Sequence, residues 1–384
     1  MSVQTREQSE TRRQKLDDVL VVDTDVHVYE LPKDLIDYID MPWQVALEQV
    51  KDRSGNFIPA FAPGASGFSF GPIWPTSHES DRIVRTPEAM REELTNINVD
   101  IGILFPNNLL KLPTLTDDEY AAALTRAYNA WLADTWCLPD QGLLGVLCAC
   151  PHAPDDTAAE IRKYAKHPGM VGVYLPSAAV DPLWGSRKYD PIYEACEEAD
   201  FAVLLHSVGI VHPAYPFNTH GFTSGFARHA TSHTFSMMAN LVDMISTGVP
   251  ERFPKLRIAF TEAGVAWVPF LMMRMDRIYR ERRHEVPFLT KPPSEYMTSF
   301  YYATQPIEEP QNLRDLVTLV DLYQGDTQTI FASDWPHHDF DHPNKIFQAP
   351  FSDDVRRKIF GENALRLLNL DANGQRLGLS SAPS

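Results

Sequence analysis

Four residues with metal-binding side chains stand at the ends of apolar runs in this sequence: Asp25, His27, His206 and Asp334. Asp25 and His27 are two positions apart, and alternate residues of a strand point to the same face of a sheet. Carboxylate oxygens and imidazole nitrogens are ligands of borderline divalent metals. Polar groups near a core cost free energy unless they are paired or hold a cation. The pattern therefore predicts one divalent metal bound by these four side chains.

Eight short apolar runs carry these residues and favour a barrel. They cover residues 19–25, 101–105, 143–150, 170–175, 202–206, 256–262, 299–305 and 330–334, with helical patterns between them at 117–136, 154–167 and 191–200. Strands that alternate with helices form parallel sheets, and eight of them favour an α/β fold of the closed (β/α)8 TIM-barrel type. An open nucleotide-binding sheet would carry a glycine-rich loop after its first strand, and this sequence has none there. The carboxyl ends of barrel strands, where active sites lie, would bring the four residues together.

The chain divides into a barrel domain and two tails. Residues 1–18 are polar and predict a mobile tail, 19–373 predict the metal-dependent barrel, and 374–384 predict a second tail. Within the barrel, the proline-, glycine- and aromatic-rich segment 28–95 predicts an inserted lid over the barrel mouth. A second irregular stretch covers residues 207–228. Long irregular segments inside compact domains are usually functional.

Composition excludes several classes of partner. The 34 Lys and Arg against 51 Asp and Glu give a net charge of −17, which repels phosphate backbones and anionic membranes. An anionic substrate would then need local positive charge, such as a metal. Four cysteines are too few for a disulfide framework, and no apolar run is long enough to span a membrane. We expect a cytoplasmic protein with a small-molecule substrate and neither nucleic acid nor membrane as partner.

Longer motifs resemble the amidohydrolase superfamily, in the branch that contains aminocarboxymuconate-semialdehyde and γ-resorcylate decarboxylases. The resemblance covers most of residues 19–370 and rests on DTDVH (23–27), GVPERFPKLRIAFTEAGVAWVPFLMMRMDR (248–277), FASDWPH (331–337) and IFGENALRLLNL (359–370). It implies a distorted (β/α)8 barrel that holds zinc or manganese at the four positions named above. The implied activity is that of a hydrolase or carboxy-lyase acting on a small organic or aromatic acid or amide. Relatives are often oligomeric, so we expect a homo- or hetero-oligomer.

One position departs from the family pattern. Decarboxylase-like members end the sixth strand with a histidine, and the matching residue here is Glu262, in FTEAG. A carboxylate is not a cationic donor near neutral pH, so Glu262 is interpreted as a general base or a further metal ligand. In hydrolysis, Asp334 would accept the proton of a metal-bound water.

Additional histidines raise a second hypothesis. His229 and His233 are four positions apart and share one face if their segment is helical. With Glu262 and His337 they predict a possible second metal. Two iron ions, or manganese with iron, would then make the chain a non-haem oxygenase, as in some superfamily members of this type. A third hypothesis is a metal-bearing noncatalytic partner subunit, because the sixth-strand residue has changed.

The predicted substrate pocket contains aromatic side chains and one more histidine. Its candidate residues are Trp74, His152, Tyr174 and Trp335. The aromatic rings would line an apolar pocket for a ring or a small organic acid. His152 follows the third predicted strand and would reach the barrel mouth from there.

Overall fold

The computed structural model describes residues 16, 18–50, 83–208 and 222–379. Its strands form one eight-stranded parallel sheet in chain order: β1 Val22–Val28, β2 Ile101–Pro106, β3 Leu143–Cys148, β4 Met170–Pro176, β5 Ala202–His206, β6 Ile258–Thr261, β7 Tyr301–Ala303 and β8 Thr329–Ile330. The predicted (β/α)8 architecture is confirmed, with each strand inside or within three residues of its predicted run.

The barrel closes between β8 and β1. The Thr24 N–H donates to the Phe331 carbonyl at 3.0 Å, and the His27 N–H donates to the Trp335 carbonyl at 2.8 Å. In the opposite direction, the Asp334 N–H donates to the Asp25 carbonyl at 3.0 Å. These bonds continue the pairing beyond the end of β8, so the last sheet edge is satisfied and metal-binding candidates from both ends of the chain meet.

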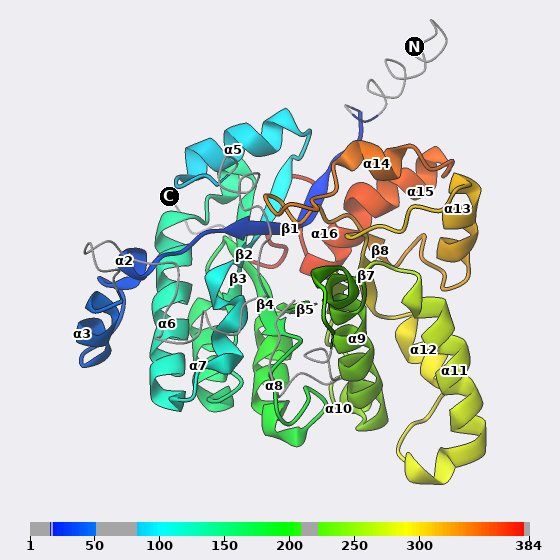
Figure 1. Cartoon of the computed structure of the whole chain (residues 1–384), viewed down its shortest axis with the longest axis horizontal. Helices are drawn as coiled ribbons and strands as arrows, with labels where there is room; N and C mark the ends of the chain where they lie inside the picture. The colour runs from blue at the N-terminus through cyan, green and yellow to red at the C-terminus, as the bar shows by residue number, and fades with distance from the viewer. Residues whose placement is uncertain (1–15, 17, 51–82, 209–221, 380–384) are drawn as a thin grey trace, which may run out of the picture.

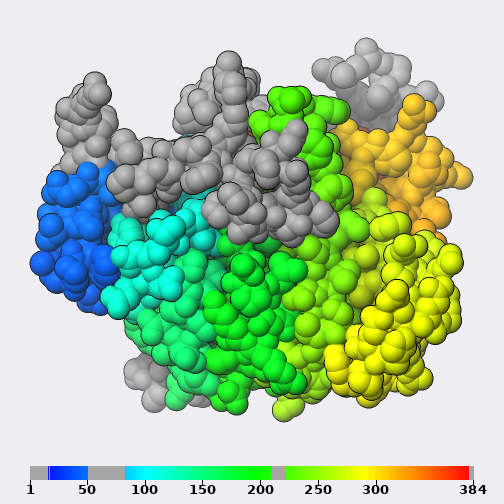
Figure 2. Space-filling model, turned by 60° about the horizontal axis from the view of Figure 1, so that its bottom comes forward, coloured from blue at the N-terminus to red at the C-terminus, as the bar shows by residue number. Residues whose placement is uncertain are grey.

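Helices cover the outside of the barrel (Figure 1). They are α2 Pro32–Leu35, α3 Trp43–Glu48, α5 Pro87–Asn96, α6 Asp118–Thr135, α7 Pro154–Tyr164, α8 Asp190–Ala199, α9 Gly225–Ser246, α10 Val249–Arg252, α11 Trp267–Arg282, α12 Pro293–Met297, α13 Leu313–Asp321, α14 Pro343–Phe347, α15 Asp353–Arg357 and α16 Asn363–Leu368. Sequence signals explain several starts: Asp117 caps α6 through the Tyr120 N–H, and Pro154 opens α7. The chain colours follow one another across the surface from α6 to α12 (Figure 2), as expected when consecutive β/α units are neighbours.

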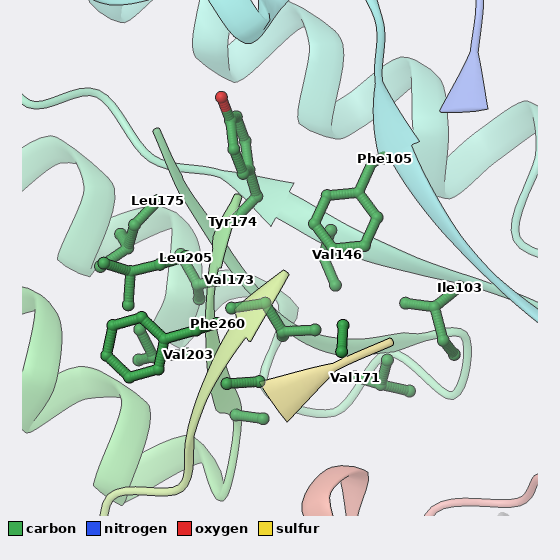
Figure 3. Packing of buried hydrophobic residues seen from close by; sticks show 14 of the residues in the cluster. Ile103, Phe105, Val146, Val171, Val173, Tyr174, Leu175, Val203, Leu205 and Phe260 are labelled. Atoms are coloured by element: carbon green, nitrogen blue, oxygen red, sulfur yellow. The ribbon is translucent and has the colours of Figure 1, made fainter. Parts of the chain in front are cut away.

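Apolar side chains fill both faces of the strands. Leu175, Leu205 and Phe260 lie on one side of strands β4 to β6, and Phe105 and Tyr174 lie on the other (Figure 3). All five are buried. A parallel sheet covered on both faces requires nearly continuous apolar strands, which is the pattern of the sequence. The strands therefore form a rigid support for the polar residues at their carboxyl ends.

The segment 28–95 is only partly described. It contains α2, α3 and α5, and its first part packs on α6, where Tyr38 donates to Asp134 at 2.9 Å and the Trp43 ring lies 5.3 Å from that of Tyr120. Residues 51–82, and Trp74 with them, lie outside the described residues. The lid therefore stays a prediction.

Both predicted tails have described residues that contact the barrel. Leu16 is buried in the core, and Arg376 donates to the carbonyls of Ala165 and Ala199. The remaining residues of 1–18 and 380–384 lie outside the described part, apart from Asp18. Among the described helices, none has the length and apolar character to cross a membrane.

Candidate metal centre

The four predicted metal ligands meet at the carboxyl end of the barrel. Asp25 and His27 lie on β1, His206 is the last residue of β5, and Asp334 lies four residues after β8. His27 Nε2 lies 3.2 Å from Asp25 Oδ1 and 3.1 Å from Asp334 Oδ1, and His206 Nε2 lies 3.0 Å from Asp25 Oδ1. One ligand atom from each residue falls within 4.8 Å of all the others, and all four residues are buried.

Backbone carbonyls orient both imidazoles. His27 Nδ1 lies 2.8 Å from the Pro106 carbonyl, and His206 Nδ1 lies 2.7 Å from the Ser207 carbonyl. A carbonyl only accepts, so each Nδ1 carries the proton and donates it. Each Nε2 of a neutral ring then directs its lone pair toward the carboxylates, which is the usual orientation of metal-ligating histidines. The histidines are thus set for a cation before one binds.

Unsatisfied atoms show that the residues fit a metal. Within the described part of the chain, Asp25 Oδ2 and His27 Nε2 are buried and have no hydrogen-bond partner. Such groups cost free energy in a core unless a ligand satisfies them. Burial lowers the pKa of His27, but the attraction of Asp25 and Asp334 outweighs burial and raises that pKa to about 10. A proton is therefore held where a cation would sit, and the donor set suits zinc, manganese or iron.

Two site residues have strained backbones. Glu262 has φ of 62° and Asp334 has φ of 61°, in the left-handed region that residues with a Cβ rarely adopt. Strained conformations persist where the surrounding structure enforces them, often at functional sites. At Asp334 the left-handed backbone interrupts the extended conformation while the pairing with β1 continues to Trp335, and it turns the carboxylate into the cluster.

Asp23, which was not predicted as a site residue, supports this turn. It is buried, and its Oδ1 accepts from the Ser333 N–H at 2.9 Å and from the Asp25 N–H at 3.1 Å. Burial raises the pKa of Asp23 to about 8 against the effect of these bonds. The side chain therefore ties β1 to the turn that carries Asp334.

Glu262 lies beside the four-residue cluster. Its Oε2 is 3.2 Å from His206 Nδ1, and its Oε1 is 3.3 Å from His233 Nδ1. Burial raises the pKa of Glu262 well above its usual value, and the charges of Asp334 and Asp25 raise it further. Glu262 also forms a possible ligand group with Asp334 and His337, within 4.8 Å of one another. The carboxyl group therefore has two possible roles, as a buried acid and as a metal ligand.

His337 joins this group through a chain of contacts. Its Nδ1 lies 2.5 Å from Asp334 Oδ1, and its Nε2 lies 2.8 Å from Asn107 Oδ1. The backbone of Asn107 donates to Glu30 Oε2 at 3.0 Å, and Glu30 Oε1 accepts from the Leu109 N–H at 2.6 Å. Glu30 and Asn107 were not predicted as site residues, although Glu30 lies close to the DTDVH motif.

The four residues predicted to bind a second metal do not all lie together in the structure. The segment is helical, as the prediction required, because α9 includes His229 and His233. His233 is buried, faces Glu262, and has a pKa lowered to about 4 by burial and by the neighbouring His229. His229 instead lies 3.1 Å from Asp339. Glu262 and His337 thus gather around Asp334, and His229 does not join them.

The predicted pocket residues lie at different distances from the cluster. The ring of Tyr174 is 5.9 Å from that of His206, and Phe105, which was not predicted, lies 5.1 Å from it. His152 Nδ1 faces Asp118 at 3.4 Å and belongs to none of the possible ligand groups among the described residues. Trp335 is buried, and its backbone pairs with β1. A substrate role for Tyr174 and Trp335 stays a prediction.

Comparisons with known proteins identify the family. A γ-resorcylate decarboxylase from Rhodococcus jostii (strain RHA1) is 25% identical over 339 residues, which cover 82% of this chain and 96% of the relative. The crystal structure of 5-carboxyvanillate decarboxylase LigW from Sphingomonas paucimobilis has a TM-score of 0.70 at 20% identity and covers 92% of this chain and 100% of its own. A 5-carboxyvanillate decarboxylase from Novosphingobium aromaticivorans DSM 12444, complexed with manganese and 4-hydroxy-3-methoxy-5-nitrobenzoic acid, has a TM-score of 0.68 at 18% identity, covering 92% and 97%. The model of the amidohydrolase family matches residues 22–370, and the chain therefore belongs to that family.

Proposed function

We propose that this protein is a metal-dependent decarboxylase of a small aromatic acid. The observation that carries the proposal is the buried cluster of Asp25, His27, His206 and Asp334 with a buried carboxyl group, Glu262, beside it. The relatives support the reaction class, because the curated matches include γ-resorcylate decarboxylases and the solved structures include 5-carboxyvanillate decarboxylases.

The four residues would hold the metal, which when bound supplies positive charge for the oxygens of an anionic substrate. That charge matters in a chain of net charge −17, whose overall field repels carboxylates. Phe105 and Tyr174 lie against His206 and present aromatic rings on the inner side of the strands. Phe105 and Tyr174 would orient the aromatic ring of the substrate so that its carboxylate points to the four-residue cluster.

Glu262 is the residue to which we assign proton transfer. Its neutral form donates a proton to the ring carbon that bears the carboxylate. The bond between that carbon and the carboxylate then breaks, its electron pair returns to the ring, and carbon dioxide leaves. Glu262 remains as a carboxylate and regains a proton from solvent. Burial and nearby carboxylates favour the neutral form that the step requires. Glu262 would thus replace the family histidine as an acid.

Metal exchange with a panel of acids tests this function. The purified protein is stripped of metal, reloaded with Mn²⁺ or Zn²⁺, and incubated with 2,6-dihydroxybenzoate and other hydroxybenzoates, while carbon dioxide and the decarboxylated arene are quantified. We expect carbon dioxide release that depends on metal and disappears in His27→Ala. Hydrolysis of amides or esters by the metal-loaded protein, without decarboxylation of any acid, would instead assign the hydrolase activity and make Asp334 the base.

A second candidate function is supported by the group of Glu262, Asp334 and His337. Together with the first cluster it would provide ligands for two metal ions that share Asp334. An oxygenase of this type would require O2, an external reductant, and redox-active iron or manganese. Elemental analysis of native protein distinguishes the candidates: paired iron or manganese favours the oxygenase, and a single zinc or manganese favours the decarboxylase.

Assembly and location belong to the same proposal. We infer a cytoplasmic enzyme, because the cysteines of the described chain are all free and buried. We further infer a homo- or hetero-oligomer, in which the segment 28–95 covers the mouth of the 19–373 barrel. Size-exclusion chromatography with light scattering, alone and with a co-expressed paralogue, tests the assembly and the noncatalytic-partner hypothesis together.

A further inference from the structure

A second group of metal-ligating side chains lies outside the candidate metal centre. His229 comes from the first turns of α9, and His338 and Asp339 come from the loop after β8. One ligand atom from each lies within 4.8 Å of the other two. We call these three residues the outer cluster. They come from segments more than 100 residues apart, so the fold brings them together.

Contact distances define the outer cluster. His229 Nε2 lies 3.1 Å from Asp339 Oδ2, and His338 Nδ1 lies 3.4 Å from Asp339 Oδ1. The two imidazole rings are 5.5 Å apart and nearly perpendicular. The two carboxylate oxygens thus face two different rings, an arrangement in which a cation between the three side chains would contact all of them.

A buried oxygen without a hydrogen-bond partner points to a ligand in the outer cluster. In the described part of the chain, Asp339 Oδ2 is buried and accepts no hydrogen bond, although His229 Nε2 is close to it. The neighbouring His233 is only 8% exposed, and its Nδ1 faces Glu262 Oε1 at 3.3 Å rather than the outer cluster. The His233 ring lies 5.0 Å from that of His229. An unsatisfied carboxylate oxygen in a histidine-rich environment is stabilised by a cation.

The ligand types select the class of metal. Two imidazoles and one carboxylate suit zinc, iron(II) and cobalt(II), whereas calcium and magnesium prefer oxygen ligands. The side chains of His229 and His338 are 33% and 38% exposed, and that of Asp339 is 21% exposed. This exposure leaves a path for an ion to enter and leaves coordination positions open to water or another small ligand.

We propose that His229, His338 and Asp339 bind a second transition-metal ion, separate from the ion of the candidate metal centre. This ion links the start of α9 to the loop after β8, and that loop also carries His337. The outer site therefore fixes the loop at the barrel mouth. The proposal does not depend on which reaction the candidate metal centre performs.

Metal stoichiometry in the full chain, without an affinity tag, tests the outer site. The protein is dialysed to equilibrium with Zn²⁺ for elemental analysis and titrated with Co²⁺, whose absorption spectrum reports the ligands. We expect His27→Ala, which damages the candidate metal centre, to retain an equivalent of metal that is lost when His229→Ala and His338→Ala are added. Asp339→Asn should also lose it, and His284→Ala is the matched control because His284 is an exposed histidine elsewhere.

Two results would overturn the proposal. One is the absence of bound metal from folded His27→Ala at saturating Zn²⁺ and Co²⁺. The other is an equivalent of bound metal that persists in His27→Ala when His229 and His338 are also replaced, but is lost when Glu262→Gln is added. That result would place the ion at Glu262, Asp334 and His337 instead. Circular dichroism verifies folding, and the melting temperature of His27→Ala should rise with Zn²⁺ only when the outer cluster is intact. A decarboxylase assay reports on the candidate metal centre alone, so failure of either proposal is recognised separately.

Discussion

His27 Nδ1 donates to the Pro106 carbonyl across 2.8 Å, and this bond between β1 and the end of β2 turns His27 Nε2 toward Asp25 and Asp334. The backbone thus selects the tautomer that a metal ligand needs. A histidine in this position without a cation would leave a buried nitrogen between two carboxylates. The geometry makes His27 the residue whose removal should affect metal binding most directly.

Replacing His27 by alanine should weaken metal binding by at least about 100-fold, because changes to the outer partners of metal ligands already cost roughly 10–100-fold. Equilibrium dialysis with Mn²⁺ and elemental analysis measure the affinity of the candidate metal centre. His284→Ala, on the surface, should bind Mn²⁺ as the unmodified chain does. Equal affinity of His27→Ala and the unmodified chain would exclude His27 as a ligand.

Metal binding to the candidate metal centre should release a proton. The pKa of His27 in the metal-free fold is raised to about 10, so the ring is protonated at neutral pH and must lose a proton to bind an ion. Apparent affinity should therefore rise about tenfold per pH unit from neutral pH until it levels off near the pKa of His27. Calorimetry in buffers of different ionisation enthalpy measures the released proton, and an affinity independent of pH would contradict the prediction.

The same pKa predicts how pH changes the stability of the metal-free protein. The folded pKa of His27 lies above the ordinary value of 6.5, so protonation stabilises the fold. This contribution is fully present below pH 6.5 and is lost as pH rises to about 10. Urea unfolding of the metal-free chain across this range measures it. The corresponding fall should be absent in His27→Gln, which cannot titrate.

Glu262→Gln should retain metal at the four-residue cluster and lose about 10²- to 10⁴-fold in turnover, the range for removal of a general acid. The amide is similar in shape but cannot donate the proton to carbon. Glu285→Gln, an exposed carboxylate, is the control. Glu262→His should recover part of the activity, because histidine is tolerated in the left-handed backbone at this position and can also donate a proton. Full activity of Glu262→Gln would remove Glu262 from the mechanism.

Much of the fold and the inner site follows from local sequence patterns. Continuous apolar runs that alternate with helical patterns predicted the barrel, and polar residues at strand ends predicted the cluster of Asp25, His27, His206 and Asp334. The least accurate strand boundary was the end of β8, which was predicted at residue 334 and lies at Ile330. Residues 331–335 still pair with β1, but Asp334 has a left-handed backbone, so the regular strand stops earlier than the apolar run. Asp23 contacts the preceding residue, Ser333, from the other end of the chain, and no local pattern reveals that contact.

Other parts of the site depend on contacts between distant segments. Glu30 and Asn107 are 77 residues apart and belong to no motif, so only the pairing of β1 with β2 brings them together. His229 and His233 do lie on one helix, the condition under which they would share a face, but helical spacing alone does not show that His229 faces Asp339 while His233 faces Glu262. Side-chain partners across the barrel mouth are decided by packing rather than by spacing.

Glu30→Gln should destabilise the protein by about 1–3 kcal/mol, the usual cost of a buried group left without its partner. Both Glu30 oxygens accept from backbone N–H groups, of Asn107 and Leu109, and a glutamine side chain can accept only one of these bonds. Urea unfolding measures the change against Glu48→Gln, an exposed residue on α3. Because Asn107 also contacts His337, turnover should fall in Glu30→Gln even at temperatures where the protein is fully folded. Unfolding free energies equal to those of the Glu48→Gln control would show that this carboxylate does not hold the loop after β2.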